Sequence, residues 1–366
     1  MIPFLDPAAQ HRSIGAEVER AILDVVRSGD CSTNPAIAEF EDAFAARCGA
    51  REAIAVNAGV SALHVALLAA GIGPGDEVIT VSAAYVATTA AILYAGARPV
   101  FVDIDPQTWT MDPSAIEPAL TPATKAIVPV HLHGRLADMD RILPIARRHR
   151  LWVIEDAAQA HGAERGSVAA GTFGDMGCFS FYPGKILSGA GDGGAVVTDR
   201  PDLADTIRCL RDMGQGSKNN HIRQGFNYRM DALQAAVLAA KLRYLDEWIH
   251  ARRRIASFYD QAFEGAAIQR PAWPDGGDHA YQIYAIRIAE RNLVRSRLEQ
   301  AGIATAIHYP LPVHLQPAYA AVGYGPGRLP VSEALSAQTL SLPIYPELSA
   351  AAVERIARAV NELCRP

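Results

Sequence analysis

Between residues 53 and 198 the sequence alternates short apolar runs with segments of helical pattern. The apolar runs lack a polar residue at every second position, so they predict strands that are buried on both faces. Such strands form parallel sheets that helices cover on both sides. We therefore predict an α/β fold with a mainly parallel central sheet. The expected strands are 53–56, 77–81, 99–104, 125–130, 151–156, 178–181 and 193–198, and the expected intervening helices are 61–71, 86–95 and 138–149.

The flanking segments predict more helices and a second domain. Helical patterns at 13–28 and 35–48 precede the alternating region, and one long helix over 231–263 follows it. A length of 366 residues fits two compact units. We predict a large domain over residues 1–245, with an N-terminal helical segment, and a smaller α+β domain over 246–366. The smaller domain is expected to hold a strand at 281–288, a helix at 291–301, a proline-rich loop at 309–330 and a helix at 349–364.

Composition excludes several classes of protein. The net charge is -5 and no long basic run is present, so nucleic acid is not an expected partner. We also expect no export signal and no membrane segment, because every long apolar stretch is interrupted by glycine, proline or charge. The five cysteines are far apart and lack the spacing of metal ligands. These features predict a cytoplasmic protein without a structural metal.

Asp156 ends the predicted strand at 151–156, at the edge where open α/β sheets place their ligands. A carboxylate there would keep a pyridine nitrogen protonated and so make the ring an electron sink. Asp156 would equally well cap a helix that begins at the next residue. Gln159, near the same face, is a candidate cofactor contact or an ordinary surface amide.

Lys185 lies in a glycine-rich turn between two predicted strands. Apolar neighbours such as Phe181 and Ile186 would keep water from its amine, lower the pKa and leave a nucleophile able to attack an aldehyde. An exposed loop lysine is the simpler alternative. Ser180, at the end of the preceding strand, is placed to donate to a phosphate oxygen.

A possible phosphate site lies at the start of the helix expected from residue 61. The free N–H groups of a helix N-terminus suit a phosphate monoester, so Gly59 and Val60 are candidate contacts, although helix starts are common. Tyr85 would stack on a flat heteroaromatic ring, or it is a core tyrosine.

Two further loops carry polar residues with no evident structural task. Asn227 and Arg229 lie just before the long helix, and Asn227 stands too early to cap it. His308, Tyr309 and His314 lie in the proline-rich loop, which is either a substrate gate or a structured turn. Taken together, the candidate residues supply an aldehyde-binding amine, an acid for a ring nitrogen, a phosphate cradle and a stacking ring. These parts predict a site for pyridoxal 5'-phosphate.

On these residues the chain resembles the DegT/StrS-type sugar aminotransferases, almost from end to end. The matching segments are GIGPGDEVI, GARPVFVDID, TKAIVPVHLHG, VIEDAAQAHGA, FSFYPGK, GDGGAVVT, NYRMDALQAAVLAAKL, HYPLPVHLQPAY and LSLPIYPEL. The resemblance implies a fold-type I pyridoxal-phosphate enzyme, a homodimer with its two active sites at the subunit interface. The sequence departs from the family pattern at Ala58-Gly59-Val60, where Ser-Gly-Thr is usual, and at Ala84-Tyr85, where Thr-Phe is frequent.

The same resemblance implies a role for each candidate residue. Lys185 would form the Schiff base and Asp156 would partner the pyridinium nitrogen. Asn227 would reach the cofactor of the neighbouring subunit. The other implied cofactor contacts are Gly59, Val60, Tyr85, Gln159 and Ser180, and the implied substrate contacts are His308, Tyr309 and Arg229.

The implied reaction moves an amino group from an amino acid, by resemblance L-glutamate, to a nucleotide-linked keto-deoxysugar, with pyridoxamine 5'-phosphate as the intermediate cofactor form. The residues leave open whether the 3-keto or the 4-keto carbon is aminated. A sugar 3-dehydratase would carry histidine in place of Lys185. An aminocyclitol or antibiotic-pathway aminotransferase, and a non-catalytic regulator of the same fold, are the alternative functions.

Overall fold

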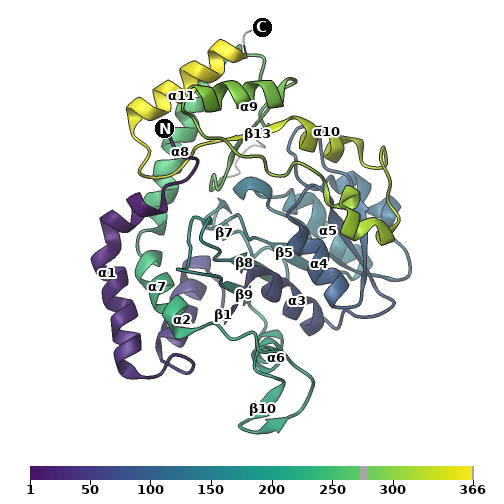
Figure 1. Ribbon diagram of the computed structural model, residues 1–366. Coiled ribbons are helices and arrows are strands. Elements are labelled where there is room, and N and C mark those ends of the chain that lie inside the picture. The colour runs from purple at the N-terminus through teal and green to yellow at the C-terminus, as the bar shows by residue number, and fades with distance from the viewer. Residues whose placement is uncertain (273–278, 365–366) are drawn as a thin grey trace.

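A seven-stranded mixed sheet forms the centre of the protein in the computed structural model, which describes residues 1–272 and 279–364 (Figure 1). The strand order is β1-β9-β8-β5-β4-β2-β3, and only β9 runs antiparallel to its neighbours. The prediction of a mainly parallel α/β sheet is therefore confirmed. The strands are β1 (Glu52–Val56), β2 (Glu77–Val81), β3 (Arg98–Val102), β4 (Thr124–Ile127), β5 (Trp152–Asp156), β8 (Met176–Ser180) and β9 (Gly194–Thr198).

Helices cover both faces of this sheet, which explains why its strands are apolar on both sides. In β1, Ala53 and Ala55 pack with α1, α2 and α7, whereas Ile54 and Val56 pack with α3, α4 and α6 on the opposite face. The helices of this part are α1 (Pro7–Ser28), α2 (Ala36–Cys48), α3 (Gly59–Ala69), α4 (Val86–Tyr94), α5 (Met139–His149), α6 (Pro201–Arg211) and α7 (Ala232–Leu242).

The prediction of a single helix over 231–263 is wrong, because this segment forms two helices, α7 and α8 (Leu245–Ala262). Arg243 and Tyr244, at the break, both bond to Glu17 of α1, the arginine through Nη2 at 2.6 Å. This tertiary contact holds the chain where it turns from the large sheet towards the C-terminal part. Helix α6 was not expected either, although Pro201 at its first position is a usual helix start.

The C-terminal part is an α+β unit with its own core, as predicted. The antiparallel pair β12 (Tyr284–Arg287) and β13 (Thr339–Leu342) packs with the end of α8, with α9 (Arg291–Gln300) and with α11 (Ala350–Leu363). The proline-rich segment holds short 3-10 helices at Val313–Leu315 and Pro317–Val322, and it leads into an unexpected helix, α10 (Pro330–Gln338). The division at residues 245 and 246 stays a prediction.

Two small ribbons complete the described fold. Two-stranded ribbons form at β6 (Glu164–Arg165) with β7 (Val168–Ala169) and at β10 (Gln215–Ser217) with β11 (Asn220–His221). The second ribbon projects from the large part beyond α6 (Figure 1). Within 1–272 and 279–364, every helix is too short or too polar to cross a membrane.

We predict that Gly177→Ala destabilises the fold. A Cβ atom at this buried β8 position would fall on the backbone of Gly171, which cannot move aside as a flexible side chain would. Such overpacking typically costs about 1–3 kcal/mol. Denaturant unfolding should report that loss, whereas Gly73→Ala, whose new Cβ would meet only the Ala95 carbonyl at 3.9 Å, should change little. Equal unfolding midpoints for both variants would contradict the packing described.

Candidate active site

The predicted site residues converge on the carboxyl edge of the parallel strands. Asp156 ends β5 and Ser180 ends β8, and these two strands are parallel neighbours. Strand β1 runs in the same direction, because both β1 and β8 are antiparallel to β9. The start of α3, which follows β1, therefore lies at the same edge. Strand β2 also ends there and leads into Tyr85 just before α4.

Asp156 is buried, with 6% of its surface exposed, and both carboxylate oxygens accept hydrogen bonds. The Thr88 hydroxyl of α4 donates to Oδ2 at 2.6 Å, and the Ala158 amide donates to Oδ1 at 3.2 Å. Turns at 158–159 and 161–162, and no helix, follow Asp156, so the helix-cap interpretation of this residue is wrong. A buried carboxylate with further acceptor capacity is suited to hold a cationic group.

The amine of Lys185 has a lowered pKa. Removal from water lowers the pKa of this half-buried lysine to about 8, while the charge of Asp156 opposes the shift. Ile186 and Leu187 are buried, as the sequence predicted, but Tyr182 is 58% exposed. The lowered pKa leaves about a tenth of the amine unprotonated at pH 7, far more than for an ordinary lysine, and a nucleophile requires the unprotonated form.

A cradle that could hold an anion lies at the same edge of the sheet. Helix α3 begins at Gly59 and Val60 without a side-chain cap among the described residues, so the N–H groups of its first turn are available to a ligand. A Cβ on Gly59 would lie 2.6 Å from Cβ of Ser180 and 3.1 Å from its hydroxyl oxygen. Only glycine therefore lets the helix start approach Ser180. The N-terminus and this hydroxyl together suit a phosphate group.

Gln159 links three parts of the site. Its Oε1 accepts a hydrogen bond from the His133 amide at 2.6 Å, and its Nε2 donates to the Tyr309 hydroxyl at 2.9 Å. The His133 ring donates from Nε2 to the His308 carbonyl at 3.1 Å. The amide of Gln159 therefore fixes the His308–Tyr309 loop against the sheet edge.

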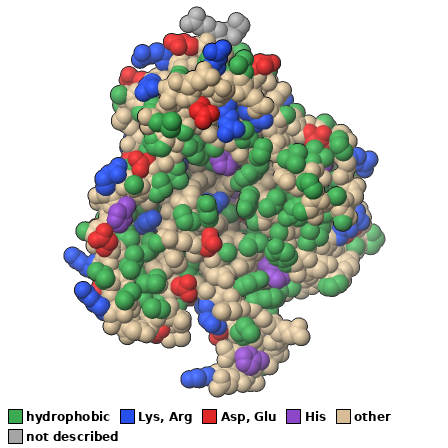
Figure 2. Space-filling model, viewed as in Figure 1, with side chains coloured by type: hydrophobic (Ala, Val, Ile, Leu, Met, Phe, Trp, Pro, Cys, Tyr) green, Lys and Arg blue, Asp and Glu red, His purple; other side chains and the backbone are tan. Residues whose placement is uncertain are grey.

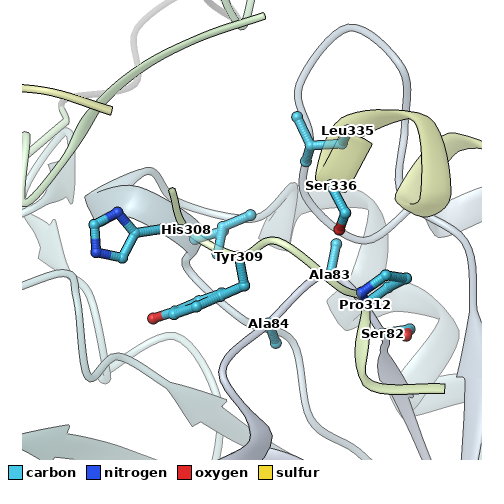
Figure 3. A pocket seen from close by; sticks show the side chains of 9 residues that line it. Ser82, Ala83, Ala84, His308, Tyr309, Pro312, Leu335 and Ser336 are labelled. Carbon is cyan, nitrogen blue, oxygen red and sulfur yellow. The ribbon is translucent and has the colours of Figure 1, made fainter. Parts of the chain in front are cut away.

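His308 and Tyr309 extend in the same direction from their loop, away from Leu335 and Ser336 of α10 (Figure 3). The Tyr309 ring lies 5.5 Å from the ring of Tyr85, at an interplanar angle of 40°. Tyr85 is 58% exposed, so it is not a core tyrosine. Between the C-terminal part and the large part, the surface is hollowed in the view of Figure 2.

The other candidates lie apart from this cluster or serve the fold. Asn227 is exposed, and its backbone carbonyl accepts from the Asn57 side chain at 3.3 Å. Arg229 is paired with Asp212. His314 is buried between the Ser82 hydroxyl, at 2.7 Å, and Glu333, at 3.1 Å. His314 therefore anchors its loop, in agreement with the structured-turn interpretation.

The aminotransferase family model named DegT/DnrJ/EryC1/StrS matches residues 12–361. The chain belongs to this family. The earlier resemblance is thus confirmed, and the α/β fold agrees with those of the family's solved structures.

Several curated family members are similar to this chain over nearly its whole length. A dTDP-3-amino-3,4,6-trideoxy-alpha-D-glucose transaminase of Streptomyces venezuelae is 43% identical, covering 99% of this chain and 96% of its own. A UDP-2-acetamido-2-deoxy-3-oxo-D-glucuronate aminotransferase of Pseudomonas aeruginosa is 40% identical, covering 99% and 100%. A pleiotropic regulatory protein of Geobacillus stearothermophilus is 41% identical, covering 100% and 99%.

Solved family structures match the fold closely. S. venezuelae DesV, in complex with a ketimine intermediate, superposes with a TM-score of 0.97 at 43% identity, covering 99% of this chain and 98% of its own. NtdA of Bacillus subtilis, with the bound cofactor PMP, gives 0.92 at 32% identity, covering 99% and 85%.

Sequence reasoning missed several residues that support the site of this family member. Thr88 stands three residues after Tyr85, one helical turn along α4, so its position gave a local signal. His133, Gln282 and Ser341 reach the site residues only through contacts between distant segments. His161 lies in the same segment as Asp156, but nothing in the sequence distinguishes a buried imidazole there.

We predict that stability falls as pH drops from about 6.5 to about 4, because buried histidines, among them His133 and His161, resist protonation. Removal from water lowers the pKa of His133 to about 4 and that of His161 to about 3. In the unfolded chain a histidine titrates near 6.5, so the unfolded state binds more protons across this window. Each ring contributes up to about 1.4 kcal/mol per pH unit.

Denaturant unfolding at a series of pH values measures this dependence. His161→Leu removes one of these buried rings, and the free energy of unfolding of this variant should fall less steeply with decreasing pH. A slope equal to that of the unchanged protein would show that His161 takes up its proton as readily in the folded as in the unfolded state, contrary to the account above.

Proposed function

We propose that this protein is a pyridoxal-phosphate-dependent aminotransferase that moves an amino group from L-glutamate to a nucleotide-linked keto-deoxysugar. The observation that carries the proposal is the amine of Lys185, its pKa lowered to about 8, facing the charge of the buried Asp156 beside an anion cradle. We further propose the 3-keto carbon as the acceptor, because two similar transaminases have names that specify a 3-amino or a 3-oxo sugar.

The residues present fit pyridoxal phosphate. The start of α3 and the Ser180 hydroxyl would hold its phosphate, and Asp156 would hold a proton on its ring nitrogen. The exposed ring of Tyr85 would cover one face, and Lys185 would hold the aldehyde carbon. When bound, the cofactor supplies an aldehyde and an electron-withdrawing ring.

The protein's own contribution is to bind, to orient and to move protons. Lys185, once its amine is free, would take a proton from the substrate carbon and return one, because an amine of pKa about 8 changes protonation state readily near neutral pH. Asp156, held by Thr88, would keep the opposite charge fixed where it is needed. His308 and Tyr309 would meet the sugar from the C-terminal side.

We propose a homodimer that places each active site at the subunit interface, in the cytoplasm. Tyr85 and Tyr182, near the site, are each 58% exposed and would offer aromatic surface to a second subunit. Asn227 is also exposed, where a second subunit could use its amide. The five cysteines are all free thiols, in keeping with a reducing compartment.

A regulatory role is the second candidate, because a relative of 41% identity carries the name of a pleiotropic regulatory protein. Damage to the cofactor residues would favour that role. Asp156, Ser180 and Lys185 are all intact here, which favours the enzyme.

The purified protein should show an absorbance band at the edge of the visible range, and L-glutamate should shift this band into the ultraviolet. Lys185→Ala should lose both the band and all amino transfer to a UDP- or dTDP-linked 3-keto sugar, because the proposal assigns both to this one amine. Lys125→Ala, at an exposed position of β4, is the matched control and should behave as the unchanged protein. Full transfer activity in Lys185→Ala would contradict the proposed role of Lys185, whereas no band and no transfer in the unchanged protein after pyridoxal phosphate is added would favour the regulatory role.

A further inference from the structure

The side-chain amide of Gln282 brackets Lys185. Its Nε2 donates to the carbonyl of Gly184 at 2.7 Å, and its Oε1 accepts from the amide of Ile186 at 2.9 Å. These two backbone groups lie on either side of Lys185 in the chain. One planar carboxamide thus fixes the peptide groups that carry the lysine, which is a two-point contact with a defined orientation.

The backbone that presents Gln282 is itself firmly held. The Arg252 guanidinium, 3% exposed, donates from Nη1 to the carbonyls of Tyr281 and Ile344, at 3.0 and 2.8 Å. The Ile283 amide donates to the His133 carbonyl at 3.2 Å, and His133 in turn donates through its own amide to Gln159. Gln282 therefore reaches the lysine from a backbone that is tied to α8, to the segment after β13 and to the site.

Ile186 and Leu187 pack in the core after the turn, but among the described residues the peptide groups next to Lys185 make few other hydrogen bonds. The Lys185 amide donates to the Tyr182 carbonyl at 2.8 Å, which closes a local turn. Across residues 1–272 and 279–364, Gln282 supplies the side-chain hydrogen bonds to backbone groups 184–186. Without them, the flanking Gly184 would leave the lysine free to sample other orientations.

We propose that Gln282 is a positioning residue that holds Lys185 in its catalytic orientation and ties that orientation to the C-terminal part of the chain. Its catalytic consequence rests on the proposed function of Lys185, whereas its effect on the lysine itself does not. The two residues are 97 positions apart in the sequence. A change in the packing of the C-terminal part would therefore alter the orientation of the lysine amine through the side-chain amide of Gln282.

Gln282→Leu removes both hydrogen bonds and keeps a side chain of similar size. Hydrogen exchange at the Ile186 amide should become faster, because that group loses its acceptor. In the cofactor-free full chain, labelling of Lys185 by a small amine reagent, followed by peptide mass spectrometry, should show a pH midpoint that moves up from about 8 towards the ordinary value of about 10.4. In the loaded enzyme kcat should fall roughly ten- to a hundredfold, with KM for glutamate little changed.

The matched control is Gln338→Leu. Gln338 is also half-buried, and its amide accepts from the Arg287 side chain at 2.6 Å within the C-terminal part, away from the lysine turn. This variant should lose comparable stability while leaving the exchange at Ile186, the labelling midpoint and kcat unchanged. Gln282→Glu keeps an acceptor for Ile186 but places an oxygen against the Gly184 carbonyl, so its effects should lie between those of the unchanged protein and Gln282→Leu.

Unchanged exchange and labelling in both Gln282 variants, or equal changes in Gln338→Leu, would overturn the proposal. This failure is distinct from a failure of the proposed function. If Lys185→Ala still transferred amino groups while the Gln282 variants shifted the labelling midpoint, the catalytic role of the lysine would fall and its positioning by Gln282 would stand.

Discussion

The carboxylate of Asp156 lies buried at the end of the middle strand of the sheet, and its charge must be balanced by the groups around it. Thr88 and the Ala158 amide supply two hydrogen bonds, and Lys185 supplies the nearby cationic group. Removal from water makes it costly to keep the carboxylate charged, and the same removal from water lowers the pKa of the lysine amine. One local environment thus produces both a fixed negative charge and a reactive amine, and the arrangement of the other site residues follows from it.

The fold delivers this environment through strand ends and completes it from a distance. Parallel strands bring Asp156, Ser180 and the start of α3 to one edge, where local sequence decides each residue's place. The C-terminal part then closes the site with His308 and Tyr309 and holds the lysine turn through Gln282. A site assembled from both parts of the chain depends on their packing, which gives the C-terminal part a direct influence on chemistry at the sheet edge.

The parts of this account that sequence could predict are those that depend on local pattern. Apolar runs without alternation predicted the central strands, and their carboxyl ends pointed to Asp156 and Lys185 as candidates. Helix propensity continued smoothly through Arg243, so the break before α8, which depends on contacts with α1, was missed. The sequence did not indicate Gln282 as a site residue, because its role depends on a contact with a distant segment that contains Lys185. The resemblance to the family identified the chemistry, but not these supporting contacts.

The most direct test of the central claim is borohydride reduction of the purified protein after incubation with pyridoxal phosphate, followed by peptide mass mapping. A buried amine with a pKa of about 8 beside Asp156 should capture the aldehyde in preference to the exposed lysines. The account predicts a stable added mass of one reduced cofactor on the peptide that contains Lys185, and its loss in Lys185→Ala. Added mass on another lysine, or none on the Lys185 peptide, would contradict it.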